Sequence, residues 1–304
     1  MSMARGALLA AICSGCLCAA TAGAQNLAQW MAALNGDRKL SELSLPGTHD
    51  SGARYDPWYG HGTTKCQDLS IRGQLDIGVR FLDIRCYQRK GEIRICHGPV
   101  DQRLTFEEVL RQCSDFLSAQ KTECIIMSIQ ENCGPIFEPA LDAQVRTNRA
   151  QWYLGAGIPK LNAVRGKIVL LRRFHAENLP EGIDATDWPD DSTNLVRQAG
   201  SNLLVQDHYR VRSIPQKWRL IQALYDESKA GDSDRLAINF ASGYRPVLSV
   251  IPWIKGCSKA INPRIEAYFT PRAPEPPPLT HAITVLDFAS RQRCAAIIRA
   301  NTFP

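Results

Sequence analysis

Two histidines with charged residues close to them in sequence are the part of this chain best suited to chemistry. His49 lies in Leu-Pro-Gly-Thr-His-Asp-Ser-Gly and His97 in Ile-Cys-His-Gly-Pro, so each follows an apolar run and enters a turn. Between them, an apolar run beginning at Phe81 contains Asp83 and ends at Arg85. An imidazole can move a proton near neutral pH, and a guanidinium can stabilise charge that develops on a phosphate. These are the residue types that cleavage of a phosphodiester requires, provided that the fold brings them together.

The elements that must position these residues follow from short apolar runs that read as strands. These runs cover residues 43–45, 79–84, 93–96, 124–129, 167–171, 203–205, 236–240 and 283–286. Apolar residues recur at helical spacing over 105–119, 214–230 and 290–300, and Thr105 is the expected cap of the first of these helices. Strands that alternate with helices predict a parallel sheet. The run 93–96 fits either a barrel strand or one arm of a hairpin.

Polar residues follow several of these runs at their carboxyl ends. Arg173 comes after the run 167–171, Asp207 after 203–205 and Asp287 after 283–286. In a (β/α) barrel the carboxyl ends of the strands form the face on which active sites are built. The pattern therefore predicts a barrel enzyme of the α/β class, irregular because the helices between the first two runs are weakly signalled.

Composition places the chain among ordinary globular proteins. Of its 304 residues, 44% are hydrophobic and 22% charged, and the net charge of +6 is spread along the chain without a basic tract. We therefore expect no nucleic-acid partner. Residues 1–24 are typical of a secretory signal, with Arg5 ahead of an apolar stretch that is too short to span a bilayer and a small-residue site ending at Ala24. We expect a secreted protein cleaved near Ala24, with residues 25–304 as a single catalytic barrel.

Eight cysteines follow the leader, and an even number in a secreted chain predicts disulfides. Cys86 and Cys96 flank a turn and are one candidate pair that could staple a hairpin, while Cys124 and Cys133 bracket one strand. The sequence leaves the pairing open. No Cys-x-x-Cys spacing occurs after the leader, so a zinc site is not expected.

Eight segments in order along the chain resemble the X domain of phosphatidylinositol-specific phospholipase C, and most closely its secreted, single-domain, metal-independent bacterial branch. The segments are 45–52, 82–85, 97–99, 125–129, 165–173, 205–209, 238–243 and 261–265. The resemblance implies a distorted, incomplete (β/α)8 barrel of the TIM type. It also implies a reaction in which the inositol 2-hydroxyl attacks the phosphorus, expels diacylglycerol and leaves inositol 1,2-cyclic phosphate.

The resemblance assigns the proton-transfer roles. His49 is expected to be the general base with Asp287 as the carboxylate that orients it, and His97 the general acid with Asp50 assisting. The alternative interpretations are structural: each histidine would be a turn residue, and Asp287 the N-cap of a helix.

Arg85 is the expected phosphate clamp, and Asp83 is expected to support the reacting groups without taking part. In the calcium-dependent relatives a carboxylate occupies the place of Arg85, and a glutamate ligand stands where this chain has Gln130. We therefore expect no metal and no other cofactor, because calcium needs six to eight oxygen ligands. A calcium-dependent phospholipase C and a metal-dependent glycerophosphodiesterase on a similar barrel are the rival enzyme classes.

The resemblance also implies a head-group site made by Arg173, Asp207 and Tyr209. Gln130 departs from the pattern, because the bacterial enzymes carry a lysine there, and it is expected to bond a hydroxyl without charge. The expected substrate is phosphatidylinositol. The sequence leaves open whether glycosylphosphatidylinositol anchors are also cleaved.

Two tryptophans after strand ends are candidates for membrane contact. Trp58 and Trp253 lie in aromatic-rich segments, and amphipathic rings of this kind suit the interfacial zone of a bilayer. The alternative is that both rings are buried in the core. We expect a monomer that contacts membranes peripherally. A rival of a different class is a non-catalytic module that binds inositol lipids.

Overall fold

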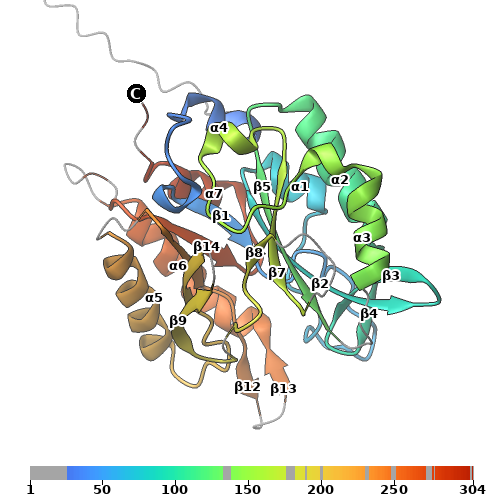
Figure 1. The fold of residues 1–304 in the computed structure, drawn as a ribbon. Coiled ribbons are helices and arrows are strands. Elements are labelled where there is room, and N and C mark those ends of the chain that lie inside the picture. Colours follow the sequence, from blue (N-terminus) through green and yellow to red (C-terminus); the bar gives the residue numbers. More distant parts are fainter. Residues whose placement is uncertain are drawn as a thin grey trace, which may run out of the picture.

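A curled, mostly parallel β-sheet forms the centre of the molecule (Figure 1). The computed structural model describes residues 26–304 except 133–137, 176–181, 189, 199–200, 230–232, 248–250, 272–275, 277, 302 and 304. The predicted leader and most of the proline-rich stretch 271–278 therefore lie outside the described residues. The central parallel strands are β1 (Leu45–Thr48), β2 (Phe81–Arg89), β5 (Ile125–Glu131), β7 (Ile168–Arg173), β10 (Ser201–Gln206), β11 (Arg235–Phe240) and β14 (Ala282–Leu286).

These strands are arranged in the order β7-β5-β2-β1-β14-β11-β10. Two short strands, β6 (Trp152–Tyr153) and β8 (Ile183–Asp184), pair with β7, and β9 (Thr193–Gln198) pairs antiparallel with β10. Within the described residues, no hydrogen-bonded pairing joins the β7 side of the sheet to the β9 and β10 side. The barrel is thus open on one side, and the predicted distorted, incomplete barrel is confirmed.

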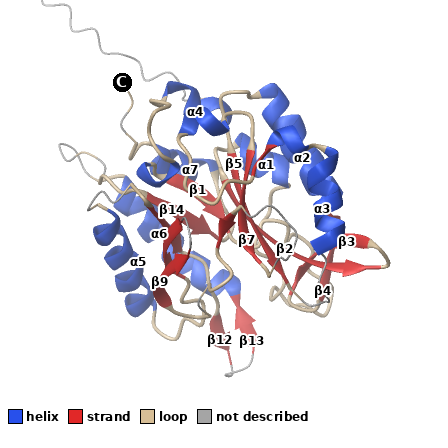
Figure 2. Cartoon of the chain, viewed as in Figure 1, coloured by secondary structure: helices blue, strands red, loops and turns tan. Residues whose placement is uncertain are grey.

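Helices surround the outer face of the sheet (Figure 2). They are α1 (Ile71–Asp76), α2 (Phe106–Ala119), α3 (Glu138–Thr147), α4 (Leu161–Val164), α5 (Ile214–Ser228), α6 (Ile254–Phe269) and α7 (Arg291–Ile298), with 3-10 turns at Leu27–Ala33, Leu40–Glu42 and Arg149–Gln151. The start of α2 is the predicted one, because the Thr105 hydroxyl accepts from the Glu108 amide and the Glu108 carboxylate accepts from the Thr105 amide. No helix in the described part is long and apolar enough to cross a membrane.

The ambiguous run 93–96 is an arm of a hairpin. It lies in β3 (Glu92–His97), which pairs antiparallel with the end of β2 and with β4 (Val100–Thr105), beyond the part of β2 that belongs to the barrel. The hairpin carries His97 back toward the carboxyl ends of the barrel strands. A second, two-stranded hairpin joins β12 (Arg245–Val247) and β13 (Ile251–Trp253), and it leads directly into α6.

A buried ion pair closes the opposite end of the barrel. Arg80 precedes β2 and Glu123 precedes β5, both side chains are fully buried, and a guanidinium nitrogen of Arg80 lies 2.6 Å from the Glu123 carboxylate. Arg80 also donates to the backbone carbonyls of Leu75, Val79 and Ala28. The charged pair is therefore fully hydrogen-bonded, which a buried charge requires.

The candidate bridge between Cys86 and Cys96 is not formed. Cys86 carries a free, buried thiol, and the hairpin register sets it opposite Ile95, so Cys96 is not its direct partner across the strands. Neighbouring residues of a strand point to opposite faces, so this register does not bring the two sulfurs together. Cys124 is also free and buried, with its sulfur 3.8 Å from that of Met31, and Cys133 lies outside the described residues.

Candidate active site

One cavity at the carboxyl ends of the strands collects most of the predicted site residues. Its volume is about 470 Å³. The predicted residues that line it are His49, Arg85, His97, Gln130, Arg173, Asp207 and Tyr209. They come from the ends of β1, β2, β3, β5, β7 and β10. The fold thus brings together residues as far apart in sequence as His49 and Tyr209.

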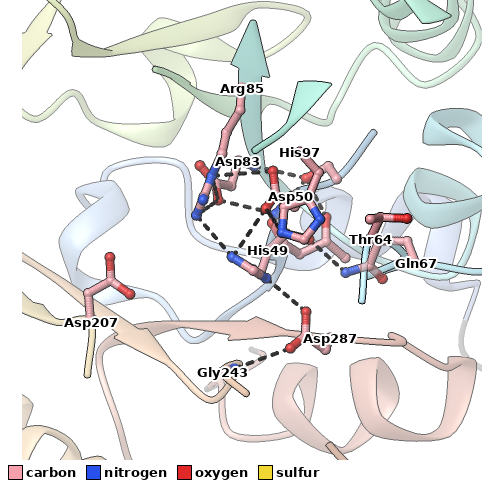
Figure 3. Close-up of polar contacts among 12 residues, drawn as sticks. His49, Asp50, Thr64, Gln67, Asp83, Arg85, His97, Asp207, Gly243 and Asp287 are labelled. Atoms are coloured by element: carbon pink, nitrogen blue, oxygen red, sulfur yellow. Dashed lines mark hydrogen bonds and ion pairs between the residues drawn. The ribbon is translucent and has the colours of Figure 1, made fainter. Parts of the chain in front are cut away.

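His49 is held from behind by a buried carboxylate (Figure 3). Its Nδ1 lies 2.8 Å from Asp287 Oδ1, and the second oxygen of Asp287 accepts from the backbone amide of Gly243 at 3.2 Å. A carboxylate that accepts at Nδ1 assigns the proton to that nitrogen, which leaves the Nε2 lone pair as the basic site. A guanidinium N–H of Arg85, 2.9 Å away, donates to Nε2.

Asp50 lies between the two imidazoles. Its Oδ2 is 3.4 Å from Nε2 of His49 and 3.4 Å from Nε2 of His97. The backbone φ of Asp50 is +40°, a left-handed conformation that Asp tolerates better than most residues. The chain turns sharply directly after β1, and this turn places the carboxylate between the histidines. Strain of this kind is typical of residues fixed at a functional site.

Arg85 is embedded in carboxylates. Its side chain lies 3.2 Å from Asp83 Oδ2 and 3.3 Å from Asp50 Oδ1, and it is 18% exposed toward the cavity. Asp83 is fully buried and also accepts from Arg173 at 3.3 Å, so it connects the two arginines. Asp83 is not among the residues that line the cavity, and it lies behind Arg85 and Arg173. The surrounding acids raise the pKa of Arg85 despite its burial, so the guanidinium is charged.

The two histidines have pKa values shifted in opposite directions. Burial lowers the pKa of His49, but the carboxylates of Asp287 and Asp50 outweigh it, and the net pKa is above the ordinary 6.5. For His97 burial dominates over the nearby Asp50, and the net pKa is below 6.5. Opposed shifts within one site are typical of acid–base pairs.

Three of the cavity side chains stand in one row across the sheet. The register of the parallel strands sets Arg85 of β2 beside Gln130 of β5, and Gln130 beside Arg173 of β7. Paired residues of neighbouring strands point to the same face of a sheet. The Oε1 atom of Gln130 is buried and has no hydrogen-bond partner within the described residues. A bound polar ligand would supply the partner that the protein does not.

Trp188 belongs to the site and was not predicted. Its ring lies 3.9 Å from the guanidinium of Arg173, and its indole N–H donates to Asp207 Oδ2 at 2.9 Å. Trp188 thereby holds both charged residues of the expected head-group site, which are themselves 4.0 Å apart. It lies in a loop after β8, where no periodicity or motif of the sequence singles it out.

Tyr209 lines the same cavity from the other side. Its hydroxyl donates to Asp190 at 2.8 Å, and its ring lies 6.1 Å from that of Tyr244 in a tilted arrangement. Burial and the neighbouring Asp190 raise the pKa of Tyr209 to about 12, so the phenol is neutral. The ring faces the cavity and is not a core residue, which leaves it available to a ligand.

The site does not offer what a calcium ion needs. Among the described residues, the groups that could hold a metal here are His49, Cys66 and Asp287, or Asp50, Cys66 and His97, with ligand atoms within 4.8 Å of one another. Each group contains one carboxylate and the Cys66 thiol, and burial raises the pKa of that thiol well above its ordinary value. Calcium takes six to eight oxygens. Arg85 already forms ion pairs with Asp50 and Asp83, so a metal ion bound to either carboxylate would lie beside a positive charge.

The two candidate membrane residues are exposed. Trp58 is 89% exposed and Trp253 is 43% exposed, which excludes the alternative that both rings are buried in the core. Trp253 ends β13, in the hairpin at the bottom of Figure 1. Gly256 allows this indole to lie against the first turn of α6, because a Cβ there would approach the ring to 2.2 Å.

Comparisons with known proteins find similarity to one family along most of the chain. A family model for the X domain of phosphatidylinositol-specific phospholipase C matches residues 43–174. The 1-phosphatidylinositol phosphodiesterase of Listeria monocytogenes is 29% identical over 289 residues, which cover 90% of this chain and 85% of that protein. The protein of the same name from Staphylococcus aureus is 29% identical over 237 residues, or 70% of this chain and 74% of that protein.

Solved structures extend the likeness to the whole barrel. A structure of the phosphatidylinositol-specific phospholipase C of S. aureus, which addresses modulation of its membrane binding, superimposes with a TM-score of 0.81 at 25% identity. It covers 91% of this chain and 98% of that protein. The Listeria enzyme superimposes with a TM-score of 0.74. The family model, the relatives and the shared fold together support placing this chain in the bacterial-type phosphatidylinositol-specific phospholipase C family.

Proposed function

We propose that this chain is a phosphatidylinositol-specific phospholipase C that releases diacylglycerol and forms inositol 1,2-cyclic phosphate. The observation that carries the mechanism is the arrangement around His49: Asp287 fixes Nδ1, and Nε2 faces the cavity beside Arg85. A base, an anion clamp and a second imidazole therefore meet at one place. This is the constellation that an internal attack on a phosphodiester requires.

In the first part of the step, the substrate phosphate takes the guanidinium of Arg85 as its partner. Nε2 of His49 then removes the proton of the inositol 2-hydroxyl while that oxygen forms its bond to phosphorus. His49 becomes positively charged, and Asp287 stabilises this charge across the 2.8 Å hydrogen bond. Arg85 offsets the negative charge that builds up on the phosphoryl oxygens.

In the second part, the bond between phosphorus and the glycerol oxygen breaks. His97 donates its proton to that oxygen, so diacylglycerol leaves as a neutral alcohol. Burial lowers the pKa of the free His97, but the negative charge of a bound phosphodiester favours its protonated form. At the end His49 holds the proton from the hydroxyl and His97 has lost one, and exchange with water restores both.

The head group is expected to be held by Arg173, Asp207 and Tyr209, with Trp188 fixing the first two. A polyol presents pairs of hydroxyls that a carboxylate and a guanidinium can bridge, and Tyr209 can stack on the ring. Gln130 lies between Arg85 and Arg173 and can bond one more hydroxyl without adding charge. Gln130 itself adds no cation, so a further phosphate on the inositol ring would gain no charge partner from this side chain.

His49→Ala tests the assignment. We expect this variant to bind phosphatidylinositol vesicles like the wild type and to release no measurable cyclic phosphate. Turnover that survives the substitution would show that the base lies elsewhere. Circular dichroism of the same preparation checks that the His49→Ala variant is folded.

We also propose that the chain is exported with loss of residues 1–24 and acts as a monomer on the outer surface of membranes. Mass spectrometry of the protein secreted by an expressing host tests the cleavage, and light scattering tests the monomer. The cyclic product of a glycosylphosphatidylinositol anchor would form by the same proton transfers. Incubation with vesicles that carry an anchored protein shows whether it is released.

A further inference from the structure

A second cavity lies next to the active site and outside the catalytic machinery. Its volume is about 740 Å³, and it opens along the β3–β4 hairpin at the right of Figure 1. The two cavities are separated by the turn between β3 and β4: His97 and Gly98 line the active-site cavity, and Pro99 and Val100 line the second one. No step of the proposed reaction uses the second cavity.

The second cavity is positively charged. Four cations and two carboxylates line it, which leaves a net charge of +2 (4 − 2); they are Arg89, Lys90, Arg94, Arg103, Glu92 and Asp101. Both carboxylates are bound by Arg94, at 2.6 Å for Glu92 and 2.5 Å for Asp101. Within the described residues, Arg89, Lys90 and Arg103 have no carboxylate partner. Three cations therefore remain for a ligand.

Arg103 is held in a fixed position by an aromatic ring. Its guanidinium lies 3.8 Å from the centre of the Tyr55 ring and donates to the Tyr55 hydroxyl at 2.5 Å. The backbone φ of Arg103 is +57°, and the amide of this strained residue donates to Asp101 Oδ1. Most exposed arginines lose side-chain entropy when they bind an anion. A stacked, fixed guanidinium loses less and is well suited to phosphate.

The cavity adjoins the aromatic residues expected to contact the bilayer. Tyr59 lines it, and the ring of Tyr59 packs edge-on against that of Trp58 at 5.6 Å. Tyr59 is 60% exposed. Exposed aromatic rings of membrane-bound proteins gather at the level of the lipid head groups. The cations beside them would then be at the height of the phosphates.

We propose that this cavity binds the phosphate group of an anionic phospholipid other than the molecule being cleaved. Arg89 and Lys90 supply charge, and Arg103 supplies a fixed pair of donors. A lipid held here fixes the hairpin that carries His97 against the membrane surface. The proposal rests on the proposed function only in placing this face of the barrel against a bilayer.

Binding to vesicles that contain no phosphatidylinositol tests this proposal. Binding is measured to vesicles of pure phosphatidylcholine and to vesicles of equal parts phosphatidylcholine and phosphatidylglycerol. We expect the wild type to prefer the mixed vesicles, and Arg89→Gln/Lys90→Gln to bind them about 30-fold more weakly, since each cation near an anionic surface contributes about 1 kcal/mol. The difference in vesicle affinity between the wild type and this variant should become smaller at high salt, because salt screens the charges.

A control variant removes the same charge elsewhere. Arg111 lies on the exposed side of α2 and Lys121 precedes the amino end of β5, at the opposite end of the barrel. Arg111→Gln/Lys121→Gln should weaken binding less than about threefold. Equal losses in the two double variants would overturn the proposal, because net charge alone would then explain binding. If soluble glycerol phosphate strongly inhibited binding to the mixed vesicles, the ligand would be a free phosphate compound and not a lipid in the membrane.

The same variants separate this inference from the proposed function. Arg89→Gln/Lys90→Gln should cleave a water-soluble inositol phosphodiester like the wild type, because neither residue lies in the active-site cavity. A wild type that prefers anionic vesicles through these residues but cleaves no phosphatidylinositol would contradict the proposed function and leave this site intact.

Discussion

At the scale of single residues, the pair His49 and Asp287 determines whether the chain can act as a base. Asp287 is fully buried, and one of its oxygens is already engaged by the Gly243 amide, so it can hold the imidazole in only one orientation. In Asp287→Asn the side-chain amide can donate to Nδ1, which would move the imidazole proton to Nε2 and remove the base. We expect kcat to fall by roughly 10³-fold or more with little change in KM.

The pH dependence of Asp287→Asn separates this role from a structural one. The carboxylate raises the pKa of His49, which is the higher of the two pKa values, so its loss should move the alkaline limb of kcat/KM to lower pH. An equal fall in activity at every pH, with no movement of the limb, would contradict the role of Asp287 in orienting and polarising His49.

The pH profile of the wild type follows from the two histidines. His49 must be neutral and His97 protonated, and this form is a minor one at every pH because the pKa of His49 lies above that of His97. Its fraction falls below the lower pKa, which is that of His97, and above the higher pKa, which is that of His49. We expect a bell-shaped kcat/KM with its maximum between the two pKa values, which lie on either side of the ordinary 6.5. His97→Ala should lose the alkaline limb on a substrate with a nitrophenol leaving group, which needs no general acid. A retained alkaline limb would show that His97 is not the acid.

A site residue can be predicted from this sequence when it lies at the end of a strand. His49, Arg85, Arg173, Asp207 and Asp287 end or follow apolar runs, and such positions meet on one face of a parallel barrel. Trp188 could not be found in this way. It acts through a loop after the two-residue strand β8, and only the fold reveals its contacts with Arg173 and Asp207.

At the scale of elements, the buried ion pair at the amino end of the barrel joins the segments that precede β2 and β5. Glu123→Gln would leave the buried guanidinium of Arg80 without a counter-charge. We expect the free energy of unfolding to fall by about 3 kcal/mol. Activity per folded molecule should be unchanged, because the pair lies at the far end of the barrel. Chemical denaturation measures the first quantity and a saturating assay the second.

A paired replacement is the control for Glu123→Gln. Arg80→Met/Glu123→Leu removes both charges, and a buried pair exchanged for apolar residues costs less than a broken pair. A double variant that is no more stable than Glu123→Gln would show that packing at this position matters more than charge.

The elements also show where sequence patterns are insufficient. Helix α2 was predicted from its capping box, but α6 was not, because Pro263 lies inside it and suggests an end. The candidate Cys86–Cys96 bridge is absent because of the strand register, which the sequence does not reveal. Two cysteines beside a turn are close in sequence, but the strand register decides whether their sulfurs face each other, and this register opposes Cys86 to Ile95.

At the scale of the whole molecule, the barrel presents its catalytic face and its exposed tryptophans together. Trp58→Ala/Trp253→Ala should weaken binding to phosphatidylcholine vesicles by at least tenfold, because each indole buries a large apolar surface. Hydrolysis of a water-soluble substrate should remain unchanged. Leu279→Ala is the matched control, since Leu279 is 53% exposed but precedes β14 at its amino end. An equal effect of both changes would contradict a specific membrane face.

The central claim is that His49 and His97 cleave the lipid by proton transfer alone, with Arg85 in place of a metal. The most direct measurement is phosphorus NMR of phosphatidylinositol vesicles incubated with the wild type in excess chelator. We expect a resonance of inositol 1,2-cyclic phosphate to grow at the same rate with and without chelator, and to be absent in His49→Ala. Loss of turnover in chelator that calcium restores would contradict it.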